Sequence, residues 1–274
     1  MFLNSDKGLD SEPNADEVYP PGFLRDGGGD KEEMLLRKKT MAEDSLTDRA
    51  YKEIKNWIIH YKLKPGVQLR IDELSTALGM SQTPIREALS KLEHEHLADR
   101  NPQKGYVVRA LNLKDVSDIY DLRMALEVVA AEEAATRMED ADRRRLSHLL
   151  EEVGMLIKRA EKAKVLILEQ EFHMRIMEAT GNWFLTEILG SIFDRIWMIQ
   201  NVNILTSDHL IDANKQHVEI YKALEEGNSL KSAALMKKHL KFTKKFVLSR
   251  LQDSNDVLAK LIMGFPESRQ FEAR

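Results

Sequence analysis

The stretch 69-LRIDELSTALGMSQTPIREALSKL-92 contains two short helical patterns separated by a turn. In the first pattern, Ile71, Leu74 and Leu78 recur at the spacing of one helix face. Gly79 follows, at the position where a glycine commonly supplies the left-handed C-terminal stop of a helix. The sequence therefore predicts a helix that ends at this glycine.

A second helix begins within a few residues of that turn. Ser81 is one candidate N-cap, and the alternative start is Thr83 followed by Pro84, since proline is tolerated in the first helical turn. The apolar face then follows the spacing i, i+3, i+4, i+7, with Ile85, Ala88, Leu89 and Leu92. Together the two patterns predict a helix-turn-helix.

The polar side of the second helix carries residue types that bind DNA. Thr83, Arg86 and Ser90 lie opposite the apolar face, and Gln82 stands at the exposed first turn. Recognition helices read base edges mainly near their N-terminus, where arginine can bond two acceptors of guanine or clamp a phosphate. Arg86 is therefore the strongest candidate contact. Two helices joined by a glycine turn also occur in helical proteins that never touch DNA, so the motif alone leaves both interpretations open.

The segment before the motif predicts a third helix. Its apolar stripe ends at Lys64-Pro65-Gly66, a turn signal. The residues of the stripe are Ala50, Ile54, Trp57, Ile58 and Tyr61. This helix is expected to pack beneath the other two.

The segment after the motif predicts a hairpin. Residues 97–100 and 106–109 have the character of short strands around the turn 101–105. At its tip, Lys104 supplies a cation and Gly105 allows close approach to a sugar-phosphate backbone, although a solvated turn lysine is the simpler interpretation. Three helices and a hairpin predict a winged helix.

Residues from Leu46 to Arg109 closely resemble the N-terminal winged-helix domain of the GntR family of bacterial transcription regulators. By this resemblance, Thr83, Arg86, Lys104 and Gly105 fall on family DNA contacts, and Arg70 lies close by. Gln82 stands where the family usually carries a DNA-contacting arginine, a departure that bears on base preference and not on the mode of binding. The residues that carry the resemblance are Pro65-Gly66, Leu69, Leu74, Leu78-Gly79, the run from Ser81 to Leu89, Leu92 and Gly105.

Composition narrows the class of protein. The chain has 274 residues, 43% of them hydrophobic, with a net charge of −4, which suits a globular protein of two domains. The absence of cysteine excludes disulfides, thiolate metal sites and cysteine nucleophiles. No apolar run is long enough to cross a bilayer, so we expect no membrane partner and a cytoplasmic location.

The two ends of the chain differ from its middle. Residues 1–44 contain few large apolar side chains and no signal-peptide pattern, which predicts a disordered, non-secretory tail. We therefore expect a DNA-binding domain over 45–110, a helical domain over 111–253 and a C-terminal tail over 254–274. The fold class is mainly α, with a winged helix-turn-helix followed by an all-α antiparallel bundle.

The helical domain is divided by five turn signals, which predict about six helices. The first helix carries an apolar stripe that we expect to face the core: Ile119, Leu122, Ala125, Leu126 and Val129. The breaks fall at Glu139-Asp140, near Lys162, and at Gly181-Asn182, Thr206-Ser207 and Gly227-Asn228. This region contains no phosphate-binding loop and no nucleophile elbow, so nucleotide hydrolysis and serine-type hydrolysis have no support.

Three histidines in the bundle occur at matching heights. His217 and His239 lie at nearly equal distances on either side of the turn at Gly227-Asn228, and His173 is also mid-helix. Neutral imidazole is a common metal ligand, and Glu169 precedes His173 by one helical turn. Scattered helix histidines more often pack, cap or face water, so spacing alone favours that simpler interpretation.

The bundle is also similar to the FCD ligand-binding domain, which follows the winged helix in one branch of GntR regulators. In metal-binding members, three histidines and an aspartate four residues before the first of them hold the ion. The resemblance therefore implies the ligands His173, His217 and His239, and Glu169 stands where aspartate is usual. The implied ion is zinc, nickel, manganese or iron. The matching segments are 122–127, 172–173, 179–182, His217 with 223–224 and 227–228, and 239–240.

Arg123 lies in the segment that faces the effector cavity in the FCD family, whose members commonly bind small organic acids. A guanidinium there can hold a carboxylate in a two-pronged fork. The alternative is a salt bridge with Glu127, one helical turn away, or with a neighbouring helix.

The expected function is that of a ligand-responsive regulator, not an enzyme. A homodimer would bind a near-palindromic operator in double-stranded DNA, and a small carboxylate effector would bind the bundle. Repression relieved by the effector is the expected sense, and activation is the alternative, because the sign depends on the position of the operator. The rival hypothesis is a metal-dependent enzyme that uses the three histidines with Glu169 or Glu171 as general base. A third is a helical oligomer with structural histidines and a vestigial DNA-binding head.

Overall fold

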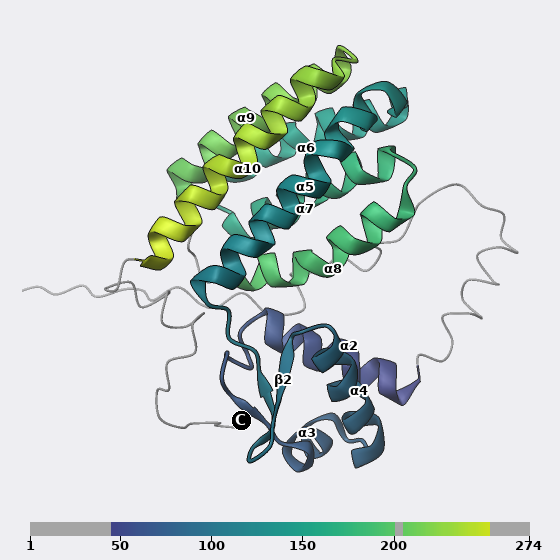
Figure 1. Ribbon diagram of the computed structural model, residues 1–274, viewed down its shortest axis with the longest axis vertical. Coiled ribbons are helices and arrows are strands. Elements are labelled where there is room, and N and C mark those ends of the chain that lie inside the picture. The colour runs from purple at the N-terminus through teal and green to yellow at the C-terminus, as the bar shows by residue number, and fades with distance from the viewer. Residues whose placement is uncertain (1–44, 201–204, 253–274) are drawn as a thin grey trace, which may run out of the picture. The chain divides into compact units, whose positions relative to one another are not determined.

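The computed structural model describes residues 45–200 and 205–252, with only the backbone placed at residue 200 (Figure 1). The predicted tails, 1–44 and 254–274, lie outside the described residues. The first described helix, α2, spans Leu46–Ile59, and the Ser45 hydroxyl caps it by accepting a hydrogen bond from the backbone N–H of Asp48.

The helix-turn-helix is formed by α3 (Ile71–Leu78) and α4 (Gln82–His94). Gly79 ends α3 in the left-handed conformation at φ 63°, as predicted. Ser81 occupies the N-cap position of α4, which confirms the first of the two predicted starts, although its side chain makes no capping hydrogen bond. The predicted apolar face of α4 is fully buried against α2 and α3.

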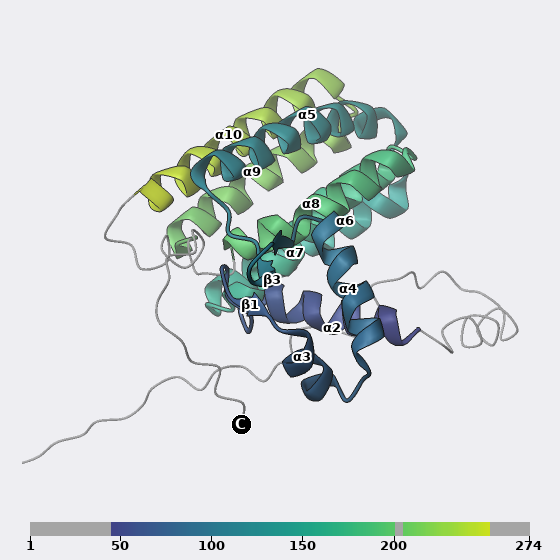
Figure 2. The same ribbon diagram turned by 60° about the horizontal axis from the view of Figure 1, so that its bottom comes forward.

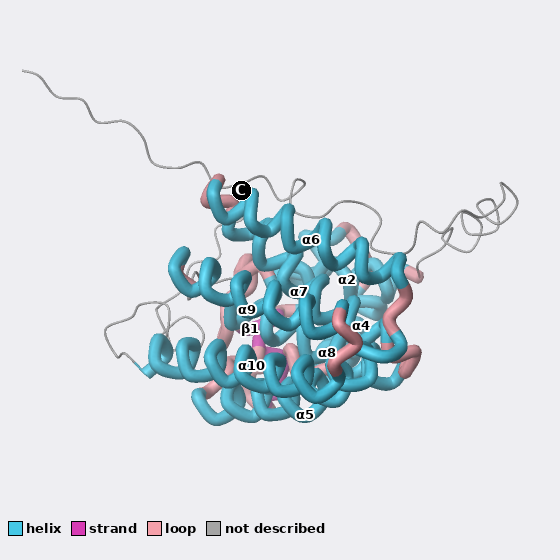
Figure 3. Tube along the Cα trace, turned by 90° about the horizontal axis from the view of Figure 1, so that it is seen from above, coloured by secondary structure: helices cyan, strands magenta, loops and turns pink. Residues whose placement is uncertain are grey.

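The wing is a three-stranded antiparallel sheet in the order β1-β3-β2. The predicted hairpin is confirmed as β2 (Ala98–Asn101) and β3 (Gly105–Val108), with Asn101 paired to Gly105 across the turn. Strand β1 (Gln68–Leu69) pairs with β3 and was not predicted, because two residues carry no recognisable alternation. The described strands are confined to this sheet, as Figure 3 shows.

Six helices make up the bundle in the described part of the chain, and their ends coincide with the predicted turn signals. Helix α5 begins at a capping box formed by Asn112 and Asp115, which accounts for the sharp boundary after the wing. The bounds are α5 Leu113–Arg137, α6 Asp140–Lys158, α7 Lys162–Ala179, α8 Trp183–Gln200, α9 Ser207–Glu225 and α10 Ser229–Gln252. The mainly α fold class is thus confirmed.

Helix α10 lies between α5 and α9, and α7 packs against α5, α6 and α8 (Figures 1 and 2). Large apolar side chains of these helices, such as Phe172, Ile176, Leu189 and Met236, form one continuous core. No helix in residues 45–200 and 205–252 has the length and apolar character that a membrane span requires.

The predicted core face of α5 is wrong. Leu122 and Val129 are 44% and 45% exposed, and the buried face carries Arg123 and Glu127 instead. Small and polar side chains on that face fit closely against α7 and α10, since Ala130, Ala131 and Ala134 are also fully buried there. Leu122, Ala125 and Val129 of the predicted stripe therefore face outward, whereas Ile119 and Leu126 are half-buried against the core.

Candidate DNA-binding surface and buried histidine centre

The N-terminal half of α4 presents three of the predicted DNA contacts to solvent. Gln82, Thr83 and Arg86 are all exposed, because the adjoining Pro84 and Ile85 turn inward to the core of the winged helix-turn-helix domain, called the head below. Arg86 donates a hydrogen bond from Nη2 to Oε1 of Gln82 at 3.2 Å, so the amide holds the guanidinium at the start of the helix. The result is an exposed polar surface of the kind that enters a major groove.

The wing tip holds two further predicted residues, Lys104 and Gly105, in an exposed turn. Gly105 has φ 72°, a conformation that favours glycine, and Oδ1 of Asn101 accepts hydrogen bonds from the backbone N–H groups of Gln103 and Lys104 at 2.9 and 3.0 Å. The turn thus projects the lysine side chain on a fixed backbone.

Arg70, the N-cap of α3, is exposed but already has acidic neighbours. Its Nη1 lies 3.3 Å from Oε1 of Glu73, and its Nε lies 3.8 Å from Oδ1 of Asp72. These carboxylates offset part of its charge, so its predicted phosphate contact would be weaker than those of Arg86 and Lys104.

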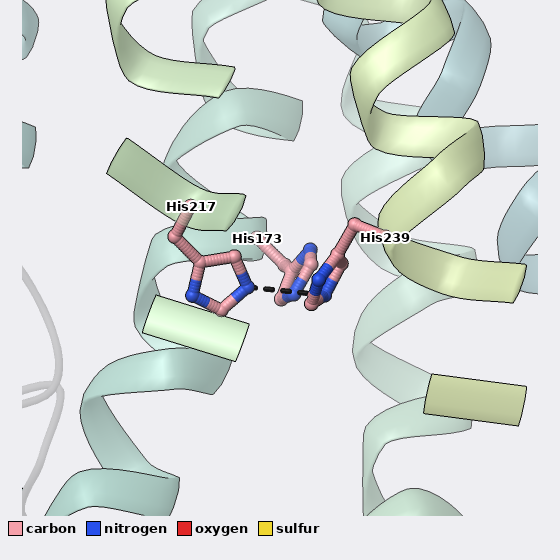
Figure 4. A group of neighbouring side chains, drawn as sticks. All are labelled: His173, His217 and His239. Atoms are coloured by element: carbon pink, nitrogen blue, oxygen red, sulfur yellow. Dashed lines mark hydrogen bonds between the residues drawn. The ribbon is translucent and has the colours of Figure 1, made fainter. Parts of the chain in front are cut away.

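Inside the bundle, His173 of α7, His217 of α9 and His239 of α10 converge (Figure 4). All three are buried, and one ring nitrogen from each lies within 4.8 Å of the others. The Nε2 atoms of His217 and His239 are 3.1 Å apart. Two imidazole nitrogens that share one zinc ion at about 2.0–2.1 Å lie roughly 2.9–3.4 Å apart, so this spacing fits a common ion.

Acceptors flank the Nδ1 atoms of two of these rings. Nδ1 of His173 lies 2.5 Å from Oε2 of Glu127, and Nδ1 of His239 lies 3.2 Å from Oε1 of Gln216. A proton held at Nδ1 leaves the Nε2 lone pair for a metal ion, the usual arrangement around metal-bound histidine. Nδ1 of His217 has no hydrogen-bond partner among the described residues.

Burial also keeps these imidazoles neutral. It lowers the pKa of His217 and His239 well below the ordinary value, and neighbouring histidines add to the effect. Burial lowers the pKa of His173 as well, although Glu127 opposes the shift. Because a metal ion binds the neutral form, the three side chains are ready as ligands near pH 7.

Glu169 is buried in the same cavity, but its carboxylate is not part of the close three-histidine group. Its Oε1 has no hydrogen-bond partner among the described residues. Burial raises its pKa to about 8, against the opposing charge of Arg123. An unpaired buried carboxyl is costly, and a cation beside it would remove that cost. The three imidazole nitrogens therefore fit a divalent ion, and Glu169 lies in the same cavity outside their close group.

Arg123 forms the predicted salt bridge, and its binding of a carboxylate stays a prediction. Its Nε donates to Oε1 of Glu127 at 2.6 Å, which is the predicted salt bridge within α5. It also lines the cavity, where its Nη2 has no hydrogen-bond partner among the described residues. Burial alone would raise the pKa of Glu127, but Arg123 and His173 outweigh it and lower the pKa to about 2. Glu127 is thus ionised between a guanidinium and an imidazole.

The cavity around these side chains is small, about 20 Å³, and its wall contains both polar and apolar side chains. One water molecule needs about 10–15 Å³ of such space, so the cavity has room for little more than an ion or a water. Its polar lining comes from α5, α7, α9 and α10: Arg123, Glu169, Gln170, His173, His209, His217, His239 and Thr243.

The sequence did not predict the roles of three residues of this site. Glu127 was considered only as a partner of Arg123, and its contact with His173 joins helices that are far apart in the chain. Gln216 gave no signal, since it acts through a neighbouring helix. His209 was detectable, because His209, Ala213 and His217 recur every four residues and all line the cavity.

Comparison with known proteins finds a family match for the DNA-binding region and another for the helical bundle. Residues 46–108 match the model of the bacterial regulatory proteins of the gntR family, and residues 118–242 match the FCD domain. An uncharacterized HTH-type transcriptional regulator of Agrobacterium vitis, from the TAR-I ttuE-ttuC' intergenic region, is 36% identical over 155 residues, 56% of this chain and 86% of that protein. The chain belongs to the GntR family.

Other relatives agree over more of the chain. The HTH-type transcriptional repressor RspR of Escherichia coli K12 is 24% identical over 226 residues, 81% of this chain and 98% of RspR. The structure of McbR/YncC from E. coli has the same fold, with a TM-score of 0.66 at 20% identity over 76% of this chain and 99% of that one. This GntR-family chain is a DNA-binding transcriptional regulator with an FCD domain.

Proposed function

We propose that this regulator is a cytoplasmic repressor whose bundle holds a divalent metal ion and releases DNA when a small organic acid binds beside that ion. One observation carries the proposal: three buried neutral imidazoles converge beside an arginine with a spare N–H in a cavity of about 20 Å³. The names of two relatives, the repressors RspR and GlaR of E. coli, support repression as the sense of control.

The DNA-binding surface in this proposal consists of α4 and the wing. Arg86 and Thr83 read base edges in the major groove, with Gln82 orienting the arginine. Lys104 and Gly105 hold the sugar-phosphate backbone, and Arg70 adds a weaker phosphate contact. Each monomer supplies one such surface, so a two-fold dimer reads a near-palindromic operator.

The ion in this proposal is zinc, nickel, manganese or iron, held by His173, His217 and His239 with Glu169 as an oxygen ligand. Glu127 and Gln216 keep the Nδ1 protons of two rings in place. When bound, the ion supplies a positive centre with open positions for an acid. Arg123 then holds a second oxygen of that acid through its spare N–H.

The size of the cavity links the acid to the state of the protein. An organic acid does not fit in about 20 Å³, so its binding requires the lining helices α5, α7, α9 and α10 to shift. A ligand that prefers the expanded arrangement displaces the equilibrium by its difference in affinity for the two states. Through this difference in affinity, the acid would weaken operator binding.

The rival enzyme hypothesis loses one of its two candidate bases. Glu171 pairs with Arg175 at 2.8 Å and lines an outer hollow between α6 and α7 that includes none of His173, His217 and His239. Glu169 remains in the cavity, but both matching family models and the curated relatives are those of transcriptional regulators. We therefore propose that the bundle senses a ligand and does not catalyse a reaction.

The deciding experiment titrates the purified protein against DNA from upstream of its own gene by mobility shift. It is run with and without EDTA and with small di- and tricarboxylic acids. We expect salt-sensitive specific binding that at least one acid weakens, and whose response to that acid disappears after metal removal. Specific binding that no acid and no chelator alters would contradict the proposed mode of control.

Two variants separate the two surfaces in that experiment. Arg86→Ala should abolish specific binding and leave metal content unchanged, since the residue lies on the head. His217→Ala should lose the metal and the response to acid, because it removes a central ligand. Loss of metal in the first variant, or full metal content in the second, would contradict the assignment.

A further inference from the structure

His209 is the buried histidine that the proposed metal site does not use. It lies on α9 two helical turns before His217, about 12 Å along the helix axis, and lines the same cavity. Its side chain is 3% exposed. Neither ring nitrogen has a hydrogen-bond partner among the described residues.

Packing alone does not explain a histidine at this position. The ring stacks on Phe242 and Phe246, with centroids 4.7 and 4.1 Å apart and interplanar angles of 3° and 24°. A phenyl ring would stack equally well without leaving two polar atoms buried and unpaired. A buried polar group without a partner in a native structure indicates a missing partner.

A role as a fourth nitrogen ligand is also not supported. In the described part of the chain, the group of mutually close ligand atoms contains His173, His217 and His239 and does not include His209. The imidazole therefore faces the cavity beyond the proposed ion. None of the described residues supplies its partner, and a molecule that enters the cavity can do so.

The imidazole of His209 is suited to hydrogen bonding in its neutral form. Burial lowers its pKa to about 4, against a small opposing effect of Asp212, so the ring is neutral near pH 7. A neutral imidazole offers one N–H donor and one lone-pair acceptor, and can pair with a carboxylate or with a hydroxyl group. Arg123, by contrast, offers only donors.

Resting on the proposed function, we propose that His209 is a ligand-recognition residue that hydrogen bonds an oxygen of the effector away from its metal-bound carboxylate. The effector is then a small acid with a second oxygen function, either a hydroxyl or another carboxylate. An acid with one carboxylate and no second polar group lacks the atom that this imidazole binds.

The test measures binding of acetate, succinate, malate and citrate to the full-length zinc-loaded protein by calorimetry. We expect at least one of the three polyfunctional acids to bind more tightly than acetate. His209→Phe keeps the stack on Phe242 and Phe246 and should weaken the binding of that acid by at least about tenfold, with zinc content unchanged. His209→Gln, which restores a donor and an acceptor, should recover part of the affinity.

His148→Phe is the matched control, because His148 is an exposed histidine on α6 outside this cavity. It should bind every acid as the unmodified protein does. If the phenyl ring does not fit at position 209, His209→Leu makes the same deletion with a smaller side chain.

Equal affinity of the unmodified protein and the His209→Phe or His209→Leu variant overturns the inference and leaves the proposed function intact. Loss of zinc in these variants also overturns it, since His209 would then support the metal. If none of the acids binds the unmodified protein, the proposed effector class fails, and this inference fails with it.

Discussion

The side chains around the histidine centre show how polar atoms select one protonation state. Glu127 contacts both Arg123 and His173, so a single carboxylate joins the arginine to the first imidazole. Gln216 serves His239 in a similar way with an uncharged amide. A proton on Nδ1 of both rings, as the proposed metal site requires, leaves each Nε2 lone pair for the shared centre.

The Gln216 contact can be tested without disturbing a buried charge. Gln216→Leu should lower metal affinity about tenfold or more, because His239 loses the acceptor that holds its Nδ1 proton. Metal affinity is measured by competition with a chromogenic chelator. Lys215→Leu changes the exposed neighbour and should leave affinity unchanged; an equal loss in both variants would indicate a general effect on α9.

His209 should make the metal-free protein sensitive to acid. Its pKa is about 4 in the folded protein and near 6.5 when unfolded, so the unfolded chain binds more protons between these values and stability falls as pH falls through this window. When the pH is lowered from 7 to 5, the free energy of unfolding of the unmodified protein should fall by about 1–2 kcal/mol more than that of the His209→Phe variant. Urea unfolding at both pH values provides the measurement. An equal loss of stability in the two proteins would contradict the lowered pKa of His209.

Among the elements, the helix-turn-helix depends on one backbone conformation. Gly79 ends α3 at φ 63°, and a Cβ at this position would meet no atom within 4 Å. The requirement for glycine is therefore conformational and not steric crowding by neighbours.

Gly79→Ala should destabilise the head by about 1 kcal/mol, because alanine resists the left-handed conformation. The effect is measured as a lower urea midpoint, followed by tryptophan fluorescence. Gly190→Ala is the control of opposite sign: it lies within α8, also has open space around it, and should be neutral or stabilise by up to about 1 kcal/mol. Equal responses at the two sites would show that backbone conformation does not decide them.

At the level of the whole molecule, the outer face of α5 bears on assembly. Leu122 and Val129 are exposed and seven residues apart, so they lie on one side of the helix with the half-buried Leu126 between them. An exposed apolar stripe of this kind is typical of an interaction surface. Because the proposed operator complex needs two copies of the chain, we infer that a second copy covers this face.

Leu122→Glu combined with Val129→Glu should convert the dimer to a monomer of 31.5 kDa, measured by light scattering on a size-exclusion column. Operator affinity should fall by about 100-fold or more, because the two heads then bind independently. Lys237→Glu, a charge change at an exposed site on α10, should leave the mass and affinity unchanged. A double variant that remains dimeric would place the subunit interface elsewhere.

Local pattern was sufficient for the order of helices, the wing hairpin and the glycine stop at Gly79, and it placed His217 and His239 at matching heights, whereas the three-histidine centre was implied by the resemblance to the FCD domain. Periodicity, caps and turn residues act within a few positions of the chain, and antiparallel helices convert equal spacing into equal height. Packing between distant segments decided the rest. The buried face of α5, the contact between Glu127 and His173, and the unpaired His209 depend on which helices become neighbours, and such contacts leave no periodic trace in the sequence.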